Sequence, residues 1–277
     1  MTKWFLLTTI FVFIVSCSNL TANKKNERDK KTELYFAQGT EMLVKKDYSR
    51  ALEYLLEAQR LAPNDSEIQN NLGMSYFFKN RMDQAKVHLT KAIELDPKNS
   101  NARNNYASLL FREKNYKEAK IQYEMVKADL VYPHQYRTNY NLALIAEVEN
   151  DLEGMIKFLN ESVAERDDFC PAHFKLGEFN FKNNNLSAAL RNYKNSSKGT
   201  CYNYAAPLYQ QALIWRKLAA PDKEFGKLSE IITNFPKSEY AQMAKEKLIS
   251  LLEQNPEMRE KIQLSLDEFN KKEIDNL

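Results

Sequence analysis

Small residues recur along the chain at a nearly constant interval. Five positions lie 34, 34, 36 and 34 residues apart: Gly39, Gly73, Ala107, Ala143 and Gly177. A second, mostly small series follows 12 residues behind them: Ala51, Ala85, Ala119, Met155 and Ala189. A fixed period of roughly 20–50 residues indicates stacked repeats, whose core grows with the length of the chain.

Two further series run in the same register. One is large: Leu55, Leu89, Tyr123, Leu159 and Tyr193. The other lies 7 residues beyond the second series: Ala58, Ala92, Val126, Ser162 and Ser196. We predict two antiparallel helices per repeat, because small side chains let neighbouring helices approach and a large one fills the adjoining hole. Proline would end the second helix of the first three repeats, at Pro63, Pro97 and Pro133.

This pattern resembles the tetratricopeptide repeat, a helix pair of about 34 residues. The resemblance implies an all-α fold, a right-handed superhelical solenoid with capping helices at its C-terminal end. The predicted repeats are 32–65, 66–99, 100–135, 136–169, 170–203 and a degenerate 204–238, followed by capping helices and a tail over 239–277. The third repeat carries a two-residue insertion around Tyr132-Pro133-His134. In the sixth, Ala220-Pro221-Asp222 is predicted to be the turn between its helices.

The N-terminus has the features of an export signal. Lys3 precedes a mainly apolar stretch of 12 residues, Trp4 to Val15, which is too short to span a bilayer and fits a signal-peptide core. Ile14-Val15-Ser16-Cys17 resembles the bacterial lipobox, in which the cysteine is lipidated and the chain is cut before it. We therefore expect a lipoprotein signal peptide over 1–16 and acylation of Cys17; the alternative is an ordinary signal peptide.

The acyl chains on Cys17 would hold the protein at a membrane surface. Ser18 follows the cysteine, which under the enterobacterial sorting rule favours the periplasmic face of the outer membrane. The polar residues up to Lys31 carry mixed charge, so 17–31 is predicted to be a flexible tether.

The composition and the motifs missing from the sequence exclude several classes of function. The chain of 277 residues is 28% charged and 43% hydrophobic, with a formal net charge of +3, which is too balanced to predict nucleic-acid binding. Phosphate-loop, zinc-protease and nucleophile-elbow motifs are missing from the sequence. We therefore expect no enzyme, no cofactor, no metal and no small-molecule substrate.

The third and fourth repeats also resemble the type IV pilus biogenesis lipoproteins known as pilotins. The motifs that carry this resemblance are Asn104-Asn105-Tyr106-Ala107, Tyr116-Lys117-Glu118-Ala119, Asp129-Leu130-Val131-Tyr132-Pro133, Asn141-Leu142-Ala143 and the later Phe235-Pro236-Lys237-Ser238. The chain departs from the family where Ala107 and Ala143 replace glycine and Met155 replaces a small residue. The resemblance implies a lipoprotein that binds the outer-membrane secretin subunit and helps the secretin reach the membrane and form its ring.

The first helices of such repeats line a groove, and equivalent positions there hold amides at Asn71, Asn105 and Asn141. A ladder of amides one repeat apart could hydrogen-bond the backbone of an extended peptide. The alternative is that these amides satisfy local backbone groups.

Apolar residues fall in the same groove by register: Phe36, Leu43, Phe77, Phe111 and Phe181. They could anchor a partner or belong to the core. Because the pilotin resemblance places partner binding in the first repeats, Phe36, Leu43 and Phe77 are the preferred anchors.

Cys170 and Cys201 bracket the fifth repeat, and an antiparallel hairpin brings both to the same end. In an exported protein a disulfide between them could form, and by closing this loop it would stabilise the fold by about 3–4 kcal/mol. The alternative is two free, buried thiols; Cys170-x-x-His173 lacks the second ligand pair that a zinc site needs.

Two functions fit this reading. The first is a pilotin-like assembly factor for the secretin. The second is a lipoprotein adaptor that scaffolds peptidoglycan hydrolases or other envelope enzymes with the same repeats and anchor. An enzyme with an added repeat domain fits least, because no stretch is left for a catalytic domain.

Overall fold

The computed structural model describes residues 25–198, 201 and 203–260. The predicted signal peptide, Cys17 and the tail beyond residue 260 lie outside these ranges. The described residues form helices and no strand. The chain divides into two compact units, 1–133 and 134–277.

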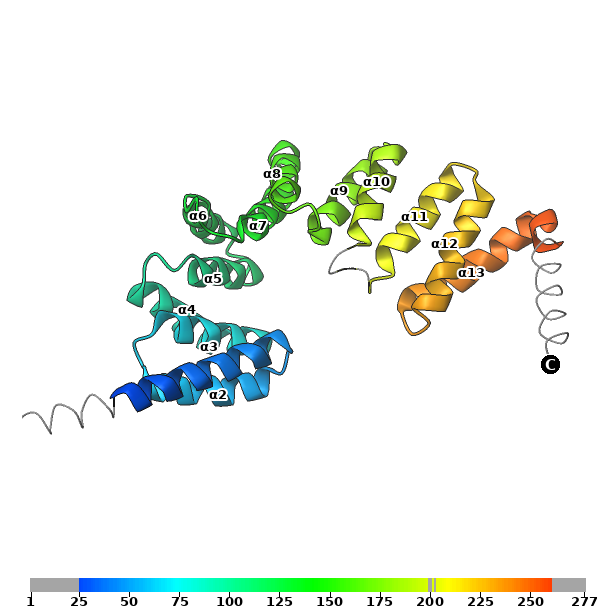
Figure 1. Ribbon diagram of the computed structural model, residues 1–277. Helices are drawn as coiled ribbons and strands as arrows, with labels where there is room; N and C mark the ends of the chain where they lie inside the picture. The colour runs from blue at the N-terminus through cyan, green and yellow to red at the C-terminus, as the bar shows by residue number, and fades with distance from the viewer. Residues whose placement is uncertain (1–24, 199–200, 202, 261–277) are drawn as a thin grey trace, which may run out of the picture. The chain divides into compact units, whose positions relative to one another are not determined.

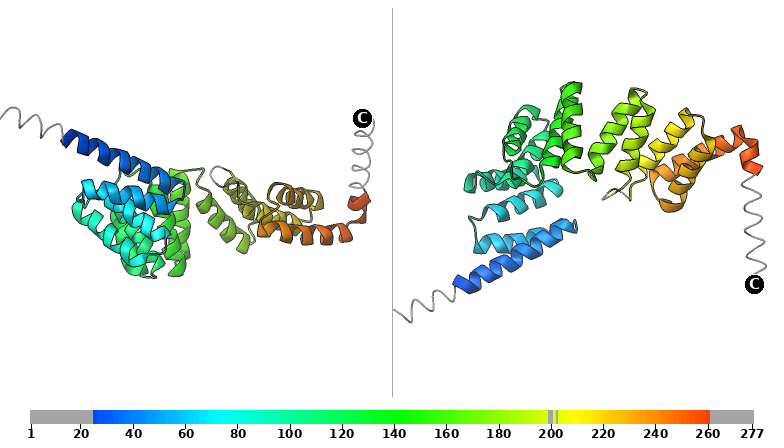
Figure 2. Two further views of the ribbon diagram at one scale, coloured as in Figure 1. Left: turned by 90° about the horizontal axis from the view of Figure 1, so that it is seen from below. Right: turned by 45° about the horizontal axis from the view of Figure 1, so that its top comes forward.

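The first unit begins with a helix over 25–44 and continues with paired helices (Figure 1). Their bounds are α2 (Tyr48–Leu61), α3 (Ser66–Phe78), α4 (Met82–Leu95), α5 (Ser100–Arg112) and α6 (Tyr116–Lys127). The second unit contains α7 (Gln135–Val148), α8 (Leu152–Glu165), α9 (Cys170–Lys182), α10 (Leu186–Ser196), α11 (Ala206–Lys217), α12 (Pro221–Asn234) and α13 (Glu239–Gln254). Within each unit, consecutive helices lie side by side in all views (Figures 1 and 2). The predicted all-α tetratricopeptide-repeat fold is confirmed.

The repeating small and large residues form the core between paired helices. Every member of the four series is buried, and the large members Leu55, Leu89, Tyr123, Leu159 and Tyr193 are at most 1% exposed. Gly73 shows why the first series is small: a Cβ built there would lie 2.6 Å from Cγ of Leu89. The period in the sequence is therefore the period of helix packing.

Polar caps start most of the second helices. The side chains of Asp47, Asn115, Asp151 and Asn185 each accept a hydrogen bond from the backbone N–H three residues on. Such a cap satisfies one of the free N–H groups at a helix N-terminus. The cap therefore fixes where each second helix begins.

The turn inside each helix pair contains one residue in the left-handed region, with φ between 50° and 62°: Lys46, Asn80, Lys114, Asn150, Asn184 and Ala219. None of them is glycine, although glycine adopts this conformation most easily. The intervals between them follow the repeat period, so the turn geometry is repeated along with the packing.

The structure differs from the sequence prediction at two places. Residues 25–31 were expected to belong to a flexible tether, but they are helical, and the Arg28 guanidinium donates to the Leu61 carbonyl with its Nε at 2.7 Å. This contact ties the added helical turns to the end of α2. Pro221 was expected in a turn but begins α12, because a proline at the first helical position loses no hydrogen bond.

Helix α13 packs against the helix pair α11 and α12 in the second unit. Ala244 and Leu251 of α13 are buried in a cluster with Leu228 and Ile231 of α12, and Ala241 of α13 is buried as well. An array of repeats needs such a cap, because its terminal helix pair otherwise exposes apolar surface.

Candidate protein-binding surface

In the first unit, the first helices of successive repeats are joined by a chain of side-chain hydrogen bonds. Asn105 of α5 donates to Oδ1 of Asn70 at 2.8 Å, and Asn70 donates to Oδ1 of its neighbour Asn71 at 3.1 Å. Asn71 then donates to Oγ1 of Thr40 at 2.9 Å, and Thr40 donates to the Phe36 carbonyl at 2.8 Å. The chain links α5, α3 and the helix over 25–44 into one continuous face.

This arrangement bears on the predicted amide ladder. Asn71 and Asn105 are both half-buried, and the side-chain amide of each donates one hydrogen bond within the protein. An amide nitrogen has two hydrogens, so one remains on each side chain. Asn70 and Thr40 were not predicted, because Asn70 has an equivalent amide in one neighbouring repeat alone, at Asn104, and the positions equivalent to Thr40 hold Met74 and Ser108.

The third predicted amide, Asn141, belongs to the second unit. It is half-buried on α7 and forms no side-chain hydrogen bond within the described part of the chain. The structure therefore joins Asn71 and Asn105 through Asn70 and leaves Asn141 outside that chain.

Phe77 and Phe111, the aromatic candidates on α3 and α5, are half-buried at the ends of their helices. The Arg112 guanidinium lies 5.0 Å from the centre of the Phe77 ring and donates to Oδ1 of Asn80 at 2.8 Å. Phe111 packs edge-on against Tyr116, with ring centres 5.2 Å apart. Each ring therefore has contacts within its own unit and keeps an exposed part.

Phe36 borders an open cavity of about 820 Å³ at the start of the first unit. Apolar and charged side chains line it together, including Ile68, Arg28, Glu33 and Asp65. Leu43 lies on the same helix but does not line this cavity; it packs against the core of the first helix pairs. Of these two residues, Phe36 lines the cavity and Leu43 does not.

The second unit has its own cavity of about 410 Å³ over its first helices. Tyr140, Phe174 and Pro207 contribute apolar surface, and Lys175 lies beside them with Nζ 3.0 Å from Glu147 and 3.3 Å from Glu178. Burial raises the pKa of Tyr140, so its hydroxyl stays neutral and can donate a hydrogen bond. This site was not predicted, since Tyr140 and Phe174 have no aromatic equivalents in the second and third repeats.

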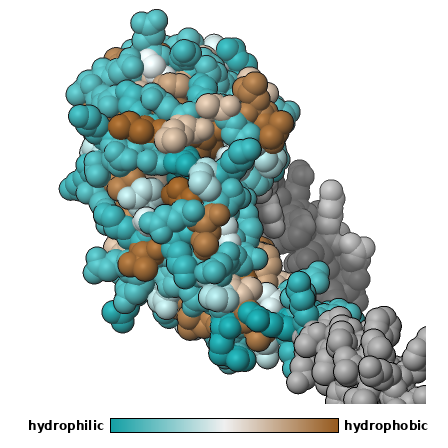
Figure 3. Space-filling view, turned by 90° about the vertical axis from the view of Figure 1, so that its left-hand side faces the viewer, coloured by the Kyte–Doolittle hydropathy of each residue, from teal (hydrophilic) through white to brown (hydrophobic). Residues whose placement is uncertain are grey.

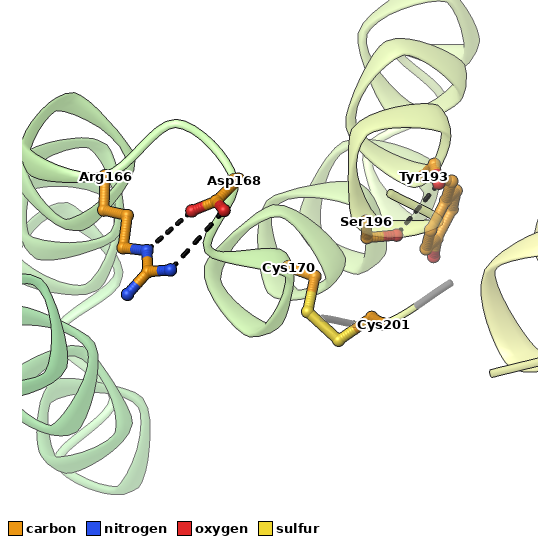
Figure 4. The surroundings of a disulfide bond; sticks show 6 residues. All are labelled: Arg166, Asp168, Cys170, Tyr193, Ser196 and Cys201. Carbon is orange, nitrogen blue, oxygen red and sulfur yellow. Dashed lines mark hydrogen bonds and ion pairs between the residues drawn. A yellow bond between two sulfur atoms is a disulfide. The ribbon is translucent and has the colours of Figure 1, made fainter. Parts of the chain in front are cut away.

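Cys170 and Cys201 are joined by a disulfide at the edge of the same cavity, with their Cα atoms 6.0 Å apart (Figure 4). This is the pairing that the sequence predicts. Cys170 begins α9, where it is 1% exposed, and Cys201 lies shortly before α11. The bond ties the start of the fifth repeat to the chain that enters the sixth.

Phe181, at the end of α9, lies 4.6 Å from the Lys217 ammonium across its ring face. It is half-buried and packs against the cluster of Tyr193 and Ile214. Its role as an anchor stays a prediction.

Ionisable groups in the core are held by structural partners. His88 Nδ1 lies 2.7 Å from Oε1 of Gln69, and burial followed by nearby Lys91 lowers its pKa. Glu224 is 3% exposed and pairs with Arg216 Nε at 2.7 Å; burial raises its pKa despite this pairing.

The described residues lack two features that would suggest other functions. No group of three or more His, Cys, Asp or Glu residues there is arranged to hold a metal ion. Among the same residues, no helix combines the length and apolarity needed to cross a membrane.

The repeated helix pairs and the continuous face of first helices define a tetratricopeptide-repeat scaffold, a class that typically binds other proteins. Sequence profiles of the tetratricopeptide repeat match residues 66–99 and 88–121. The first match has the bounds of the predicted second repeat. No curated protein matches the sequence.

Solved structures resemble the chain over most of its length. PilF of Pseudomonas aeruginosa has a TM-score of 0.67 and 18% identity, covering 80% of this chain and 99% of its own. PilW, described as a widely conserved type IV pilus biogenesis factor, has a TM-score of 0.65 and 20% identity, covering 76% and 97%. A chain of the APC/C hetero-tetramer Cut9–Hcn1 has a TM-score of 0.67 and 17% identity, and the match covers 84% of this chain and 45% of its own. At these identities the likeness establishes the fold.

Proposed function

We propose that this chain is an outer-membrane lipoprotein that binds a partner protein and promotes localisation and multimerisation of the type IV pilus secretin. The observation that carries the proposal is the match to PilF and PilW, which extends over 99% and 97% of those two chains. The motifs in the third and fourth repeats support it as well, since they occur in the order that pilotins have. Catalysis, cofactors and small-molecule substrates have no part in this function.

In this proposal the lipid on Cys17 fixes the protein at the periplasmic face of the membrane, and the first helices hold the secretin subunit. The cavity beside Phe36 suits an apolar side chain of the partner, while Arg28 and Glu33 at its rim suit polar groups. The remaining amide hydrogens of Asn71 and Asn105 would donate to the partner's backbone. A scaffold of this kind keeps an aggregation-prone subunit in place until the ring assembles.

The test follows secretin multimers in cell envelopes after deletion of the gene. We expect secretin monomers without multimers, and restoration by the wild-type chain but not by Cys17→Ala. Normal multimers in the deletion strain would refute the secretin role. Recovery of peptidoglycan hydrolases in place of secretin by the tagged protein would instead support the adaptor function.

A matched pair of variants tests the binding surface itself. Phe36→Ser removes the apolar wall of the cavity, whereas Val44→Ser changes a 79% exposed residue on the same helix that does not line it. We expect only Phe36→Ser to reduce secretin binding in a pull-down with purified subunits. Circular dichroism spectra that match the wild type would show that both variants are folded, and equal binding by both would exclude this cavity.

A further inference from the structure

The loop after α6 exposes two adjacent apolar side chains. Leu130 is 92% exposed and Val131 is 89% exposed, more than any other large apolar residue in the described part of the chain; the next, Val44, is 79% exposed. On the face drawn in Figure 3, hydrophobic residues form separate patches in a mostly hydrophilic surface. Single exposed apolar residues are ordinary, but a contiguous pair at a loop tip needs an explanation.

The loop is fixed on both sides of this pair. Asp129 accepts a hydrogen bond from Ser100 Oγ at 2.6 Å and a weaker one from the Val131 backbone N–H at 3.3 Å. Tyr132 is 8% exposed, and its hydroxyl donates to Oδ1 of Asn101 at 3.2 Å. Leu130 and Val131 are therefore held outward by neighbours with fixed positions. Binding a partner then costs less conformational entropy, because the loop is already ordered.

A cavity of about 500 Å³ opens beside the loop, lined by apolar groups of Pro97, Met125, Ala128 and Val131. Met125 is itself 50% exposed. A concave, partly apolar site accepts a side chain from a partner, whereas a flat membrane surface would leave it unfilled. The third repeat is two residues longer than its neighbours here, and insertions into repeats commonly map to a binding face.

The charges around this cavity indicate the partner's chemistry. Lys98 and Arg103 form no ion pair within the described residues, and Arg103 donates instead to Oε1 of Gln122 at 2.8 Å and to the Pro97 carbonyl at 3.0 Å. The one carboxylate in the lining, Asp129, accepts from Ser100. The lining therefore carries an excess of positive charge next to its apolar groups.

We propose that the loop carrying Leu130 and Val131, with the cavity beside it, is a second docking site that binds an acidic segment of a partner protein bearing an apolar side chain. The apolar side chain enters between Met125 and Val131, and the flanking carboxylates of the partner pair with Lys98 and Arg103. This cavity shares no lining residue with the cavity beside Phe36 on which the proposed secretin role depends.

The experiment measures binding of short labelled peptides to the purified full chain by fluorescence anisotropy. One set has leucine or methionine flanked by aspartates; control sets replace the aspartates with lysine or the apolar residue with serine. We expect the first set to bind at least about tenfold more tightly than either control, which corresponds to about 1.4 kcal/mol. Equal binding of the lysine peptides, or no binding by the acidic set, would overturn the proposal.

The variants are chosen to leave the fold intact. Leu130→Ser combined with Val131→Ser, and separately Lys98→Glu, should each weaken binding at least about tenfold without changing the melting temperature. Val87→Ser, at a 65% exposed position on α4, is the matched control and should bind like the wild type. Wild-type affinity in the double variant would overturn the proposal, as would binding to phosphatidylglycerol vesicles that depends on Leu130 and Val131 when no peptide binds.

Discussion

Gly73 and Gly226 are both helical glycines, but their surroundings are opposite. A Cβ on Gly73 would lie 2.6 Å from Cγ and 2.8 Å from Cδ2 of Leu89, while a Cβ on Gly226 would meet nothing within 4 Å. Alanine favours a helix over glycine by about 1 kcal/mol at either position. Overpacking a core costs about 1–3 kcal/mol, so at Gly73 it outweighs that gain.

We therefore expect Gly73→Ala to lower the free energy of unfolding by up to about 2 kcal/mol and Gly226→Ala to raise it by up to about 1 kcal/mol. Urea denaturation followed by circular dichroism measures both. Stabilisation by Gly73→Ala would mean that Leu89 moves aside at little cost.

His88 makes stability depend on pH. Its ring stacks on Tyr76 with centres 5.2 Å apart, and burial, followed by Lys91, lowers its pKa from the ordinary value of 6.5. The folded state thus holds the proton less tightly than the unfolded state, so the contribution of His88 is complete above about pH 6.5 and is lost as the pH falls through the lowered pKa.

The measurement is the midpoint of urea unfolding between pH 7.5 and pH 5 for the wild type and for His88→Gln. We expect the wild type to lose more stability over this range than the variant. Parallel curves for the two proteins would show that His88 titrates alike in the folded and unfolded states.

Among the elements, the turns within helix pairs carry a conformational cost. Ala219 has φ of 50°, and its methyl group offers no compensating contact at this exposed position. The left-handed conformation costs a non-glycine residue about 1–2 kcal/mol. Part of this is offset in a glycine variant by the greater freedom of the unfolded chain.

Ala219→Gly should therefore raise the free energy of unfolding by about 0.5–1 kcal/mol. Ala37→Gly, at an exposed helical position, should lower it by about the same amount, because glycine weakens a helix. Differential scanning calorimetry compares the two. A loss of stability in both variants would show that the turn carries no strain.

The sequence predicted the helix pairs because packing repeats with the chain: Gly73 faces Leu89 in the same way that Gly39 faces Leu55. It did not predict the hydrogen-bonded chain through Asn70 and Thr40, because those bonds join residues 35 and 31 apart and so fall between equivalent positions. A repeating sequence pattern therefore predicts contacts that occur in every repeat but not contacts that occur once.

As with the fold, only part of the candidate site could be predicted from the sequence. Register placed Phe36, Asn71 and Asn105 on the first helices, where the structure has them. The cavity beside Phe36 was not foreseen, since it depends on the helix continuing back to residue 25 and on Arg28 reaching the end of α2. The mixed charge of residues 25–31 predicted a tether. The sequence could not correct this prediction, because nothing in it indicates that Arg28 bonds to a carbonyl 33 residues away.

At the scale of the whole molecule, the array must be closed at its end. Ala244 of α13 is fully buried in the last core cluster, and its neighbour Met243 is 40% exposed. A carboxylate placed at Ala244 would lose its hydration without gaining a partner, which costs several kcal/mol.

We expect Ala244→Glu to detach α13 and expose the apolar face of α11 and α12, which binding of a hydrophobic dye and a lowered melting temperature would report. Met243→Glu, one residue earlier on the same helix, should change neither. If the two variants behaved alike, α13 would not be acting as a cap.

The chain of side-chain bonds from α5 to the helix over 25–44 also has a mechanical consequence. Hydrogen bonds of 2.8–3.1 Å lose their strength after a small displacement, whereas apolar surfaces slide past one another more gradually. Under a pulling load, the first unit would therefore behave as a stiff element that yields abruptly.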